Sequence, residues 1–337
     1  MSTENSALLV VVTVPPTIRV ALTEDDLSRL CAAHPQVRVE LIAAPAAFLE
    51  RLATADGAIV WPTFLPSNAV LTQFPRLRWV QAMTVGVEDI LTPELVAAEQ
   101  VALTATKGPM AESMAEHAVA LLLALARHLP AFVADQQAQR WRSGADISGS
   151  QPMVELFGKT IAVLGVGEVG SALARICKAG FGMRVLGMTR TRRDLPFVDR
   201  SFEQADLHAA LGEVDVVALA MPATAATVAI IDAAALAAMK PSAFLINVAR
   251  GRLVDEAALV AALRSGRIAG AGLDTVGAEP LAADSPLWSL PNVVITPHIA
   301  PRTDAVFRHM VDFWCDNIRC FAAGQPLHGL VDRQAGY

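Results

Sequence analysis

One short stretch near the middle of the chain restricts its fold more than any other part of the sequence. Residues 160–164 form an apolar run that leads directly into a G-x-G-x-x-G pattern at residues 165–170. A helical pattern follows at residues 171–177, and a second apolar run covers residues 183–188. A strand, a glycine turn, a helix and another strand in this order predict a βαβ unit.

The three glycines have separate roles in such a turn. Gly165 permits the tight turn, Gly167 lets backbone amides approach a pyrophosphate, and Gly170 lets the helix pack closely on the strand. Glu168 and Val169 lie at the N-terminus of the helix, which adds partial positive charge. A plain strand-to-helix turn is the alternative for a bare glycine triplet, but the flanking strand and helix favour dinucleotide binding.

Length and composition indicate a soluble globular protein of two domains. The 337 residues are enough for two domains of ~150 residues, each with its own core. With 53% hydrophobic and 18% charged residues, the chain shows no sign of disorder. Its net charge of -6 argues against a nucleic-acid binder, which normally has a basic face.

The N-terminal segment and the cysteines favour a cytoplasmic protein. The apolar run at residues 7–14 is too short to span a bilayer, and no basic residue precedes it, so we expect a first strand and no membrane segment. The cysteines have no metal-ligand spacing, and we expect reduced core residues at Cys31, Cys177, Cys315 and Cys320. We therefore predict a cytoplasmic protein without a bound metal.

The N-terminal third of the chain alternates short apolar runs with helical patterns, as parallel α/β sheets do. The expected strands are residues 8–14, 37–42, 57–61, 77–83 and 101–104. The expected helices are residues 24–33, 46–55, 68–74 and 92–98, with Thr23 and Thr92 as N-caps.

A long apolar helix is expected at residues 114–129, and a helix of this composition is buried or lies in an interface. The segment that follows, residues 131–158, has few strand signals and contains Trp141, Gly144, Gly149 and Pro152. It is either an arm that embraces a partner subunit or an ordinary surface loop. We predict that the helix and this segment form a two-fold homodimer.

The C-terminal half resumes the alternation of strands and helices. Further strands are expected at residues 214–221, 243–247, 270–274 and 293–296, and helices at residues 233–239 and 256–265. Together with the central βαβ unit, they predict a six-stranded doubly wound sheet. The last expected helix, residues 302–323, has an apolar stripe and is expected to return to the first domain.

The predicted fold class is α/β, with two doubly wound domains. A Rossmann dinucleotide-binding domain, residues 108–299, is expected to be inserted in a flavodoxin-like substrate domain made of residues 1–107 and 300–337. The chain then crosses between the domains twice, and these crossings are expected to act as hinges when both ligands bind.

Polar stretches follow three of the expected strands. Arg250 lies in N-V-A-R-G at residues 247–251, Glu279 lies after G-L-D at residues 272–274, and His298 ends T-P-H. In an open α/β sheet, ligands bind beyond the carboxyl ends of the strands. We therefore expect an arginine, a carboxylate and a histidine to converge on one cleft.

At these residues the chain resembles the D-isomer-specific 2-hydroxyacid dehydrogenase family, and within it the glyoxylate/hydroxypyruvate reductases. The glycine fingerprint, V-A-R-G, G-L-D with E-P, and T-P-H occur in the order and approximate spacing of that family. Two further motifs share the resemblance, T-V-G-V at residues 84–87 and S-P-L-W at residues 285–288.

The resemblance implies the reduction of a 2-oxo acid to a D-2-hydroxy acid. Arg250 would bind the substrate, His298 would be the general acid, and Glu279 would hydrogen-bond His298 and favour its protonated form. Backbone amides at Val85 and Gly86 would hold the substrate carboxylate. Singly, Arg250 reads as a salt-bridge partner, Glu279 as a loop charge and His298 as a buried histidine, but their combination favours the catalytic interpretation.

The resemblance also implies a set of cofactor-binding residues. Asp274 would bind the nicotinamide carboxamide, although a capping or turn aspartate is the alternative. Besides the glycine turn, the predicted set includes Pro222, Thr227 and Val248.

The end of the second strand of the βαβ unit predicts which cofactor is preferred. NAD-binding folds place an acidic residue there to bind the ribose 2′-hydroxyl. Here Thr189 takes that position and Arg190 follows, with Arg192 and Arg193 close behind. A hydroxyl and guanidinium groups suit a 2′-phosphate, so we predict that NADP(H) is preferred and NAD(H) possible. A solvated basic loop is the alternative, above all for Arg192 and Arg193.

The sequence does not name the 2-oxo acid. Trp61, Phe64 and Met83 lie near strand ends and are either walls of an apolar pocket or core residues. Glyoxylate, hydroxypyruvate and bulkier 2-oxo acids all remain candidates. The alternative function is that of a corepressor, since such proteins use the same scaffold to bind dinucleotide and partner peptides.

Overall fold

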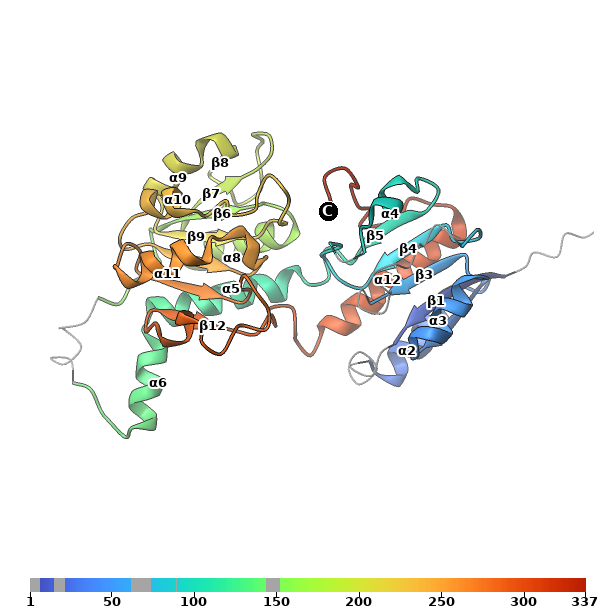
Figure 1. The fold of residues 1–337 in the computed structure, drawn as a ribbon, viewed down its shortest axis with the longest axis horizontal. Coiled ribbons are helices and arrows are strands. Elements are labelled where there is room, and N and C mark those ends of the chain that lie inside the picture. Colours follow the sequence, from blue (N-terminus) through green and yellow to red (C-terminus); the bar gives the residue numbers. More distant parts are fainter. Residues whose placement is uncertain (1–6, 15–21, 62–73, 89, 144–151) are drawn as a thin grey trace, which may run out of the picture. The chain divides into compact units, whose positions relative to one another are not determined.

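The computed structural model describes residues 7–14, 22–61, 74–88, 90–143 and 152–337. It is an α/β protein with two parallel sheets (Figure 1), so the predicted fold class is confirmed. The chain separates into two compact units. The first contains Met1–Met110 and Thr303–Tyr337, and the second contains Ala111–Arg302.

The first unit has a five-stranded sheet of flavodoxin-like order, β2-β1-β3-β4-β5. Its strands are β1 Leu8–Thr13, β2 Val37–Ile42, β3 Gly57–Val60, β4 Trp79–Ala82 and β5 Ala102–Ala105. Its helices are α2 Glu24–Cys31, α3 Pro45–Leu52, α4 Pro93–Ala97 and α12 Val306–Ala323. Residues 68–73 of the expected helix 68–74 lie outside the described residues.

Thr23 and Thr92 are N-caps of helices α2 and α4, as predicted. The Thr23 hydroxyl accepts from the Asp26 amide at 3.1 Å, and the Asp26 carboxylate accepts from the Thr23 amide at 3.0 Å, which makes a capping box. The Thr92 hydroxyl accepts from the Leu95 amide at 3.3 Å.

A buried polar network joins the C-terminal helix α12 to the sheet of the first unit. The Trp314 indole donates to the Thr106 hydroxyl at 3.0 Å, and the Asn317 amide donates to Gln81 Oε1 at 2.8 Å. Trp314, Thr106, Asn317 and Gln81 are all fully buried. Because buried polar groups need partners, this network specifies where α12 packs.

The second unit has a seven-stranded parallel sheet of order β12-β11-β10-β9-β6-β7-β8. Its strands are β6 Thr160–Leu164, β7 Arg184–Met188, β8 Arg200–Phe202, β9 Val216–Leu219, β10 Phe244–Asn247, β11 Gly270–Leu273 and β12 Val293–Ile295. The expected count of six strands was wrong. The additional strand β8 has three residues and a single buried one, Phe202, so it has no apolar run to reveal it.

Helices cover both faces of the seven-stranded sheet. They are α5 Ala111–Ala126, α6 Leu129–Gln137, α8 Glu168–Phe181, α9 Leu207–Glu213, α10 Ala233–Ala238 and α11 Glu256–Arg264, with single 3₁₀ turns at Gln204–Asp206, Gly251–Leu253 and Pro286–Ser289. Along β6, Ile161 and Val163 belong to the apolar core under α5 and α8, while Ala162 and Leu164 belong to the core on the other face. Burial on both faces explains why β6 is continuously apolar.

The long helix expected at residues 114–129 is interrupted. Helix α5 ends at Ala126, His128 adopts the left-handed region with φ 54°, and α6 begins at Leu129. A helix thus fills the start of the segment expected to be a loop or an arm, while Gly144 and Gly149 lie outside the described residues. In the described part of the chain, no single helix is long and apolar enough to cross a membrane.

The cysteines are only partly as expected. All four are free thiols; Cys177 and Cys315 are buried, Cys320 is half-buried and Cys31 is exposed. The prediction of a core position was therefore wrong for Cys31, which lies at the exposed end of α2. Among the described residues, no three histidine, cysteine or acidic side chains are grouped as metal ligands.

Candidate active site

The order in which strands are added to the second sheet reverses between two neighbouring parallel strands, β6 and β9. Strand β6 pairs with β7 on one side and with β9 on the other, so the two connections leave β6 and β9 in opposite directions along the sheet. In doubly wound sheets, the crevice at the carboxyl ends of such strands is the ligand site.

The glycine turn lies at this crevice. Gly165 has φ 97°, and a Cβ atom there would be 2.6 Å from the Met221 Cβ after β9. A Cβ atom on Gly170 would be 2.0 Å from the Gly165 carbonyl oxygen, so the helix packs against the turn as predicted for the third glycine. At Gly167, by contrast, an added Cβ would meet no described atom within 4 Å. The middle glycine therefore faces open space, as close approach of a ligand requires.

The N-terminus of α8 follows directly and is open to a ligand. Gly167 is its N-cap, and among the described residues no side chain caps the first amides. Glu168 is exposed and Val169 half-buried in this first turn. A helix N-terminus with uncapped amides beside an open glycine suits the pyrophosphate of a dinucleotide.

The loop after β7 carries the residues predicted to choose the cofactor. Thr189 is half-buried, and Arg190 and Arg193 are exposed. The Arg192 guanidinium is bound to the Asp206 carboxylate at 2.6 Å, and it holds the pKa of Asp206 below its usual value. The Arg193 amide donates to the Ser201 hydroxyl at 3.0 Å. Arg192 is thus paired within the protein, which favours for this residue the alternative of a basic surface loop.

Two predicted cofactor residues shape the loop after β9. The Thr227 hydroxyl donates to the Pro222 carbonyl at 2.8 Å and accepts from the Thr224 amide at 2.8 Å. Val248, which follows β10, is 1% exposed and belongs to the core beneath α5. Pro222 and Thr227 therefore belong to one local turn after β9, while the Val248 side chain lies in the core.

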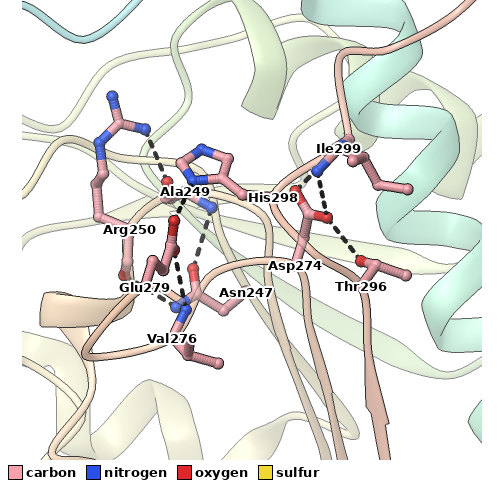
Figure 2. A network of polar contacts seen from close by, with 10 residues as sticks. Asn247, Ala249, Arg250, Asp274, Val276, Glu279, Thr296, His298 and Ile299 are labelled. Atoms are coloured by element: carbon pink, nitrogen blue, oxygen red, sulfur yellow. Dashed lines mark hydrogen bonds and ion pairs between the residues drawn. The ribbon is translucent and has the colours of Figure 1, made fainter. Parts of the chain in front are cut away.

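The turn after β10 holds Arg250 through a buried asparagine. Asn247 is 1% exposed; its amide donates to the Arg250 carbonyl at 2.9 Å and its side-chain oxygen accepts from the Ala249 amide at 3.0 Å. The Arg250 guanidinium donates to the Ala249 carbonyl at 2.8 Å (Figure 2). A Cβ atom on Gly251 would be 1.8 Å from the Val276 carbonyl, so only glycine fits where this turn meets the segment after β11.

His298 and Glu279 form a hydrogen-bonded pair (Figure 2). His298 Nδ1 lies 2.7 Å from Glu279 Oε2, and Glu279 Oε1 accepts from the Val276 amide at 3.3 Å. The side chains are 43% and 38% exposed, so the pair is open to a substrate. Arg250, Glu279 and His298 follow β10, β11 and β12, which are neighbours in the sheet. The structure thus brings Glu279 and His298 into contact, and it places Arg250 after the next strand of the same sheet.

Asp274 is a buried acidic residue of the predicted site. It is 2% exposed, and its Oδ1 accepts from the Thr296 hydroxyl at 2.6 Å and the Ile299 amide at 2.9 Å. Its Oδ2 accepts from the Ala300 amide at 2.9 Å. His117, which the sequence did not single out, lies 2.8 Å from the Thr296 hydroxyl. These contacts give Asp274 a structural role in the turn that carries His298.

The predicted substrate-binding amides belong to the first unit. Val85 and Gly86 follow β4 at its carboxyl end and are half-buried. The Thr84 hydroxyl donates to the Gly86 carbonyl at 2.6 Å, which holds the turn. Of the candidate pocket walls, Met83 is 0% exposed and is a core residue, Trp61 is half-buried, and Phe64 lies outside the described residues.

Comparison with known proteins identifies the family. The profile of the D-isomer specific 2-hydroxyacid dehydrogenases, NAD binding domain, matches residues 119–300, which is more than half of the chain. The chain belongs to this family. Its membership confirms the resemblance drawn from the sequence motifs, and with it a Rossmann domain that binds a nicotinamide dinucleotide.

Relatives that cover most of the chain agree with this identification. A glyoxylate reductase of Pyrococcus furiosus is 36% identical over 288 residues, 85% of each chain. Glyoxylate/hydroxypyruvate reductase B of Pectobacterium atrosepticum is 36% identical over 322 residues, 95% of this chain and 98% of that one. A family member of Xanthobacter autotrophicus, solved in complex with NADPH and MES, superposes with a TM-score of 0.77 at 33% identity and covers 98% of this chain and 100% of its own. The chain described by this sequence is accordingly an oxidoreductase.

Proposed function

We propose that this dehydrogenase reduces a small 2-oxo acid, of the glyoxylate or hydroxypyruvate type, to the D-2-hydroxy acid with NADPH. The observation that carries the proposal is the exposed pair of Glu279 and His298, 2.7 Å apart, which follow β11 and β12, while Arg250 follows the neighbouring strand β10. The names of the relatives from Pyrococcus and Pectobacterium support this substrate class.

Each of the three side chains has a distinct proposed role. Arg250 binds the negatively charged substrate through its guanidinium, whose planar donors suit a carboxylate. Glu279 accepts a hydrogen bond at His298 Nδ1, which leaves Nε2 of the same ring for the proton transfer. Glu279 therefore sets the tautomer and the orientation of the imidazole.

The proposed reaction balances with one hydride and one proton. NADPH, when bound, supplies the hydride that adds to the carbonyl carbon of the 2-oxo acid. His298 donates its proton from Nε2 to the carbonyl oxygen as charge develops there, and the product is a hydroxyl group. Arg250 stabilises the same developing charge.

The two units have different proposed tasks. The second unit binds the dinucleotide, in agreement with the family profile over residues 119–300, and the first unit holds the substrate carboxylate through the amides of Val85 and Gly86. The proposed boundaries are residues 1–107 and 300–337 for the substrate domain and 108–299 for the dinucleotide domain. The two crossings of the chain are the proposed hinges.

The preference for NADPH rests on the loop after β7. Neither position 189 nor position 190 holds an acidic residue, since they are Thr189 and Arg190, and Arg193 is exposed. Cations beside a hydroxyl favour a 2′-phosphate, which an acid would repel. NADPH in the Xanthobacter structure supports the same preference.

The proposed assembly is a two-fold homodimer through α5, α6 and the segment that follows. Leu129 and Val133 of α6 are 49% and 51% exposed, and Trp141 is 94% exposed. Exposed apolar side chains of this size, close together in sequence, mark an interface. Sedimentation at micromolar concentration tests the assembly, and a monomer would refute it.

The enzymatic activity is tested by oxidation of NADPH with a panel of 2-oxo acids. We expect turnover of glyoxylate or hydroxypyruvate, and loss of turnover in Arg250→Ala. Arg252→Ala is the matched control because Arg252 is an exposed arginine two residues on in the chain. Dinucleotide binding without turnover of any acid would overturn the proposal and favour the corepressor alternative.

A further inference from the structure

His117 lies behind the turn that carries His298. It belongs to α5, and its Nε2 is 2.8 Å from the Thr296 hydroxyl and 3.4 Å from Asp274 Oδ1. The His117 side chain is 21% exposed and that of Asp274 is 1% exposed. Because 179 residues separate His117 from Thr296, this contact is made by the tertiary fold.

The hydrogen-bonding pattern assigns the proton on the His117 ring. The Asp274 carboxylate is an acceptor, since its two oxygens receive the backbone amides of Ile299 and Ala300. The Thr296 hydroxyl, 2.6 Å from Asp274 Oδ1, therefore donates its one hydrogen to that oxygen. The Thr296 oxygen is left to accept, so His117 Nε2 carries the hydrogen and donates it.

This chain of bonds holds a turn whose backbone is unusual. His298 has φ 54°, in the left-handed region that residues other than glycine rarely adopt. Its amide donates to the Asp274 carbonyl at 2.8 Å, and Thr296 on one side and Ile299 on the other are both bonded to the Asp274 carboxylate (Figure 2). Such a conformation persists where its surroundings over-determine it.

We propose that His117 is a positioning residue for the general acid of this enzyme. By donating to Thr296, it fixes the hydroxyl that binds Asp274, and Asp274 in turn holds the turn that directs the His298 ring at Glu279. The inference rests on the proposed function, because it gives His117 a part in reduction through His298.

Two substitutions of His117 separate this role from simple packing. His117→Gln keeps an N–H donor of similar reach, whereas His117→Leu fills the space without one. We expect kcat of His117→Leu to fall on the order of ten- to a hundredfold, the effect of a small displacement of a catalytic group, with little change in the KM for NADPH. His117→Gln should restore most of the turnover. Equal kcat in wild type and His117→Leu would overturn the proposal.

A double-mutant cycle tests whether the effect passes through Thr296. Thr296→Val removes the hydroxyl that joins His117 to Asp274, so it should lower kcat to a similar degree. The double variant with His117→Leu should then be little worse than either single variant, because both break the same chain. Fully additive losses would show that His117 acts by another route.

A measurement without turnover distinguishes failure of this inference from failure of the proposed function. Ring signals of ¹⁵N-labelled histidine are recorded for the full chain, and His298→Gln identifies the signal of His298. That signal should change in His117→Leu and stay near its wild-type position in His117→Gln. If no 2-oxo acid is reduced but the signal behaves in this way, the proposed function fails and the positioning role of His117 stands. An unchanged signal in His117→Leu refutes the positioning role.

Discussion

The Nδ1 atom of His298 lies 2.7 Å from Oε2 of Glu279, although 19 residues separate them in the chain. Glu279 follows β11 and His298 follows the adjacent strand β12. Glu279 Oε1 also accepts from the Val276 amide, and the His298 amide donates to the Asp274 carbonyl. A carboxylate at Nδ1 sets the orientation and tautomer of an imidazole. The pair is therefore the element on which the proposed acid catalysis depends.

The first prediction concerns this pair. His298→Gln should lower turnover of the 2-oxo acid by about 10² to 10⁴, the usual effect of removing a positioned acid, while the Kd for NADPH stays nearly the same. Glu279→Gln should lower turnover by about ten- to a hundredfold, as expected for the loss of one hydrogen bond to a charged group. Steady-state kinetics and NADPH titration measure both effects. His309→Gln, an exposed histidine on α12, is the control, and wild-type turnover in His298→Gln would require another acid.

A second prediction concerns the choice of cofactor. Replacing Thr189 by Asp together with Arg190→Ala should shift the ratio of kcat/KM for NADPH over NADH by at least about tenfold towards NADH, since charge-assisted bonds are lost and a repelling acid is gained. Arg192→Ala is the matched control, because the Arg192 guanidinium is already bound to Asp206. A wild-type preference for NADH, or an unchanged ratio in the double variant, would contradict the proposed role of this loop.

A third prediction concerns the C-terminal segment. The Arg333 guanidinium donates to the carbonyls of Leu95 and Ala98 at 2.6 Å each, and also to that of Val101, at the end of α4 and the start of β5. Arg333→Ala removes the guanidinium donor from all three carbonyls, of which those of Leu95 and Ala98 keep only a backbone amide donor. The free energy of unfolding of the first unit, measured with urea, should therefore fall by about 1 to 3 kcal/mol.

Arg319→Ala is the control for Arg333. Arg319 and its partner Asp316 on α12 are 55% and 58% exposed, and an exposed pair of this kind contributes about 0.5 kcal/mol or less. If the two alanine variants unfolded at the same urea concentration, the Arg333 contacts would not stabilise the fold.

A fourth prediction concerns pH. Burial raises the pKa of the Cys177 thiol to about 12, and the side chain is fully buried in α8. In the unfolded chain this thiol has a pKa of about 8.5, so the stability that the buried thiol contributes is complete below that pH and is lost as the pH rises towards the pKa of the folded state. The difference in the free energy of unfolding between wild type and Cys177→Ala should therefore change by about 2 kcal/mol between pH 8 and pH 10, to the disadvantage of wild type. Urea unfolding at the two pH values measures it, and a constant difference would contradict the buried neutral thiol.

The sequence alone determined the elements whose signals are local. The apolar run before Gly165 and the spacing to Gly170 predicted a strand, a turn and a helix, and these are β6 and α8. Thr23 and Thr92 marked helix starts because their hydroxyls bind amides three residues on. Arg250, Glu279 and His298 could be named for the same reason, since each follows an apolar strand and strand ends meet at one edge of a parallel sheet.

Only the tertiary structure decided the features that depend on distant partners. Strand β8 has no apolar run and exists because it pairs with β7 at the sheet edge. Three further contacts join residues whose neighbours in the sequence give no sign of them. They are the bond between His117 and Thr296, the ion pair of Arg192 with Asp206, and the bond from Arg333 to the Leu95 carbonyl in α4. A short-range pattern records which face of an element is buried, but a hydrogen bond forms wherever the folded chain brings donor and acceptor within about 3 Å.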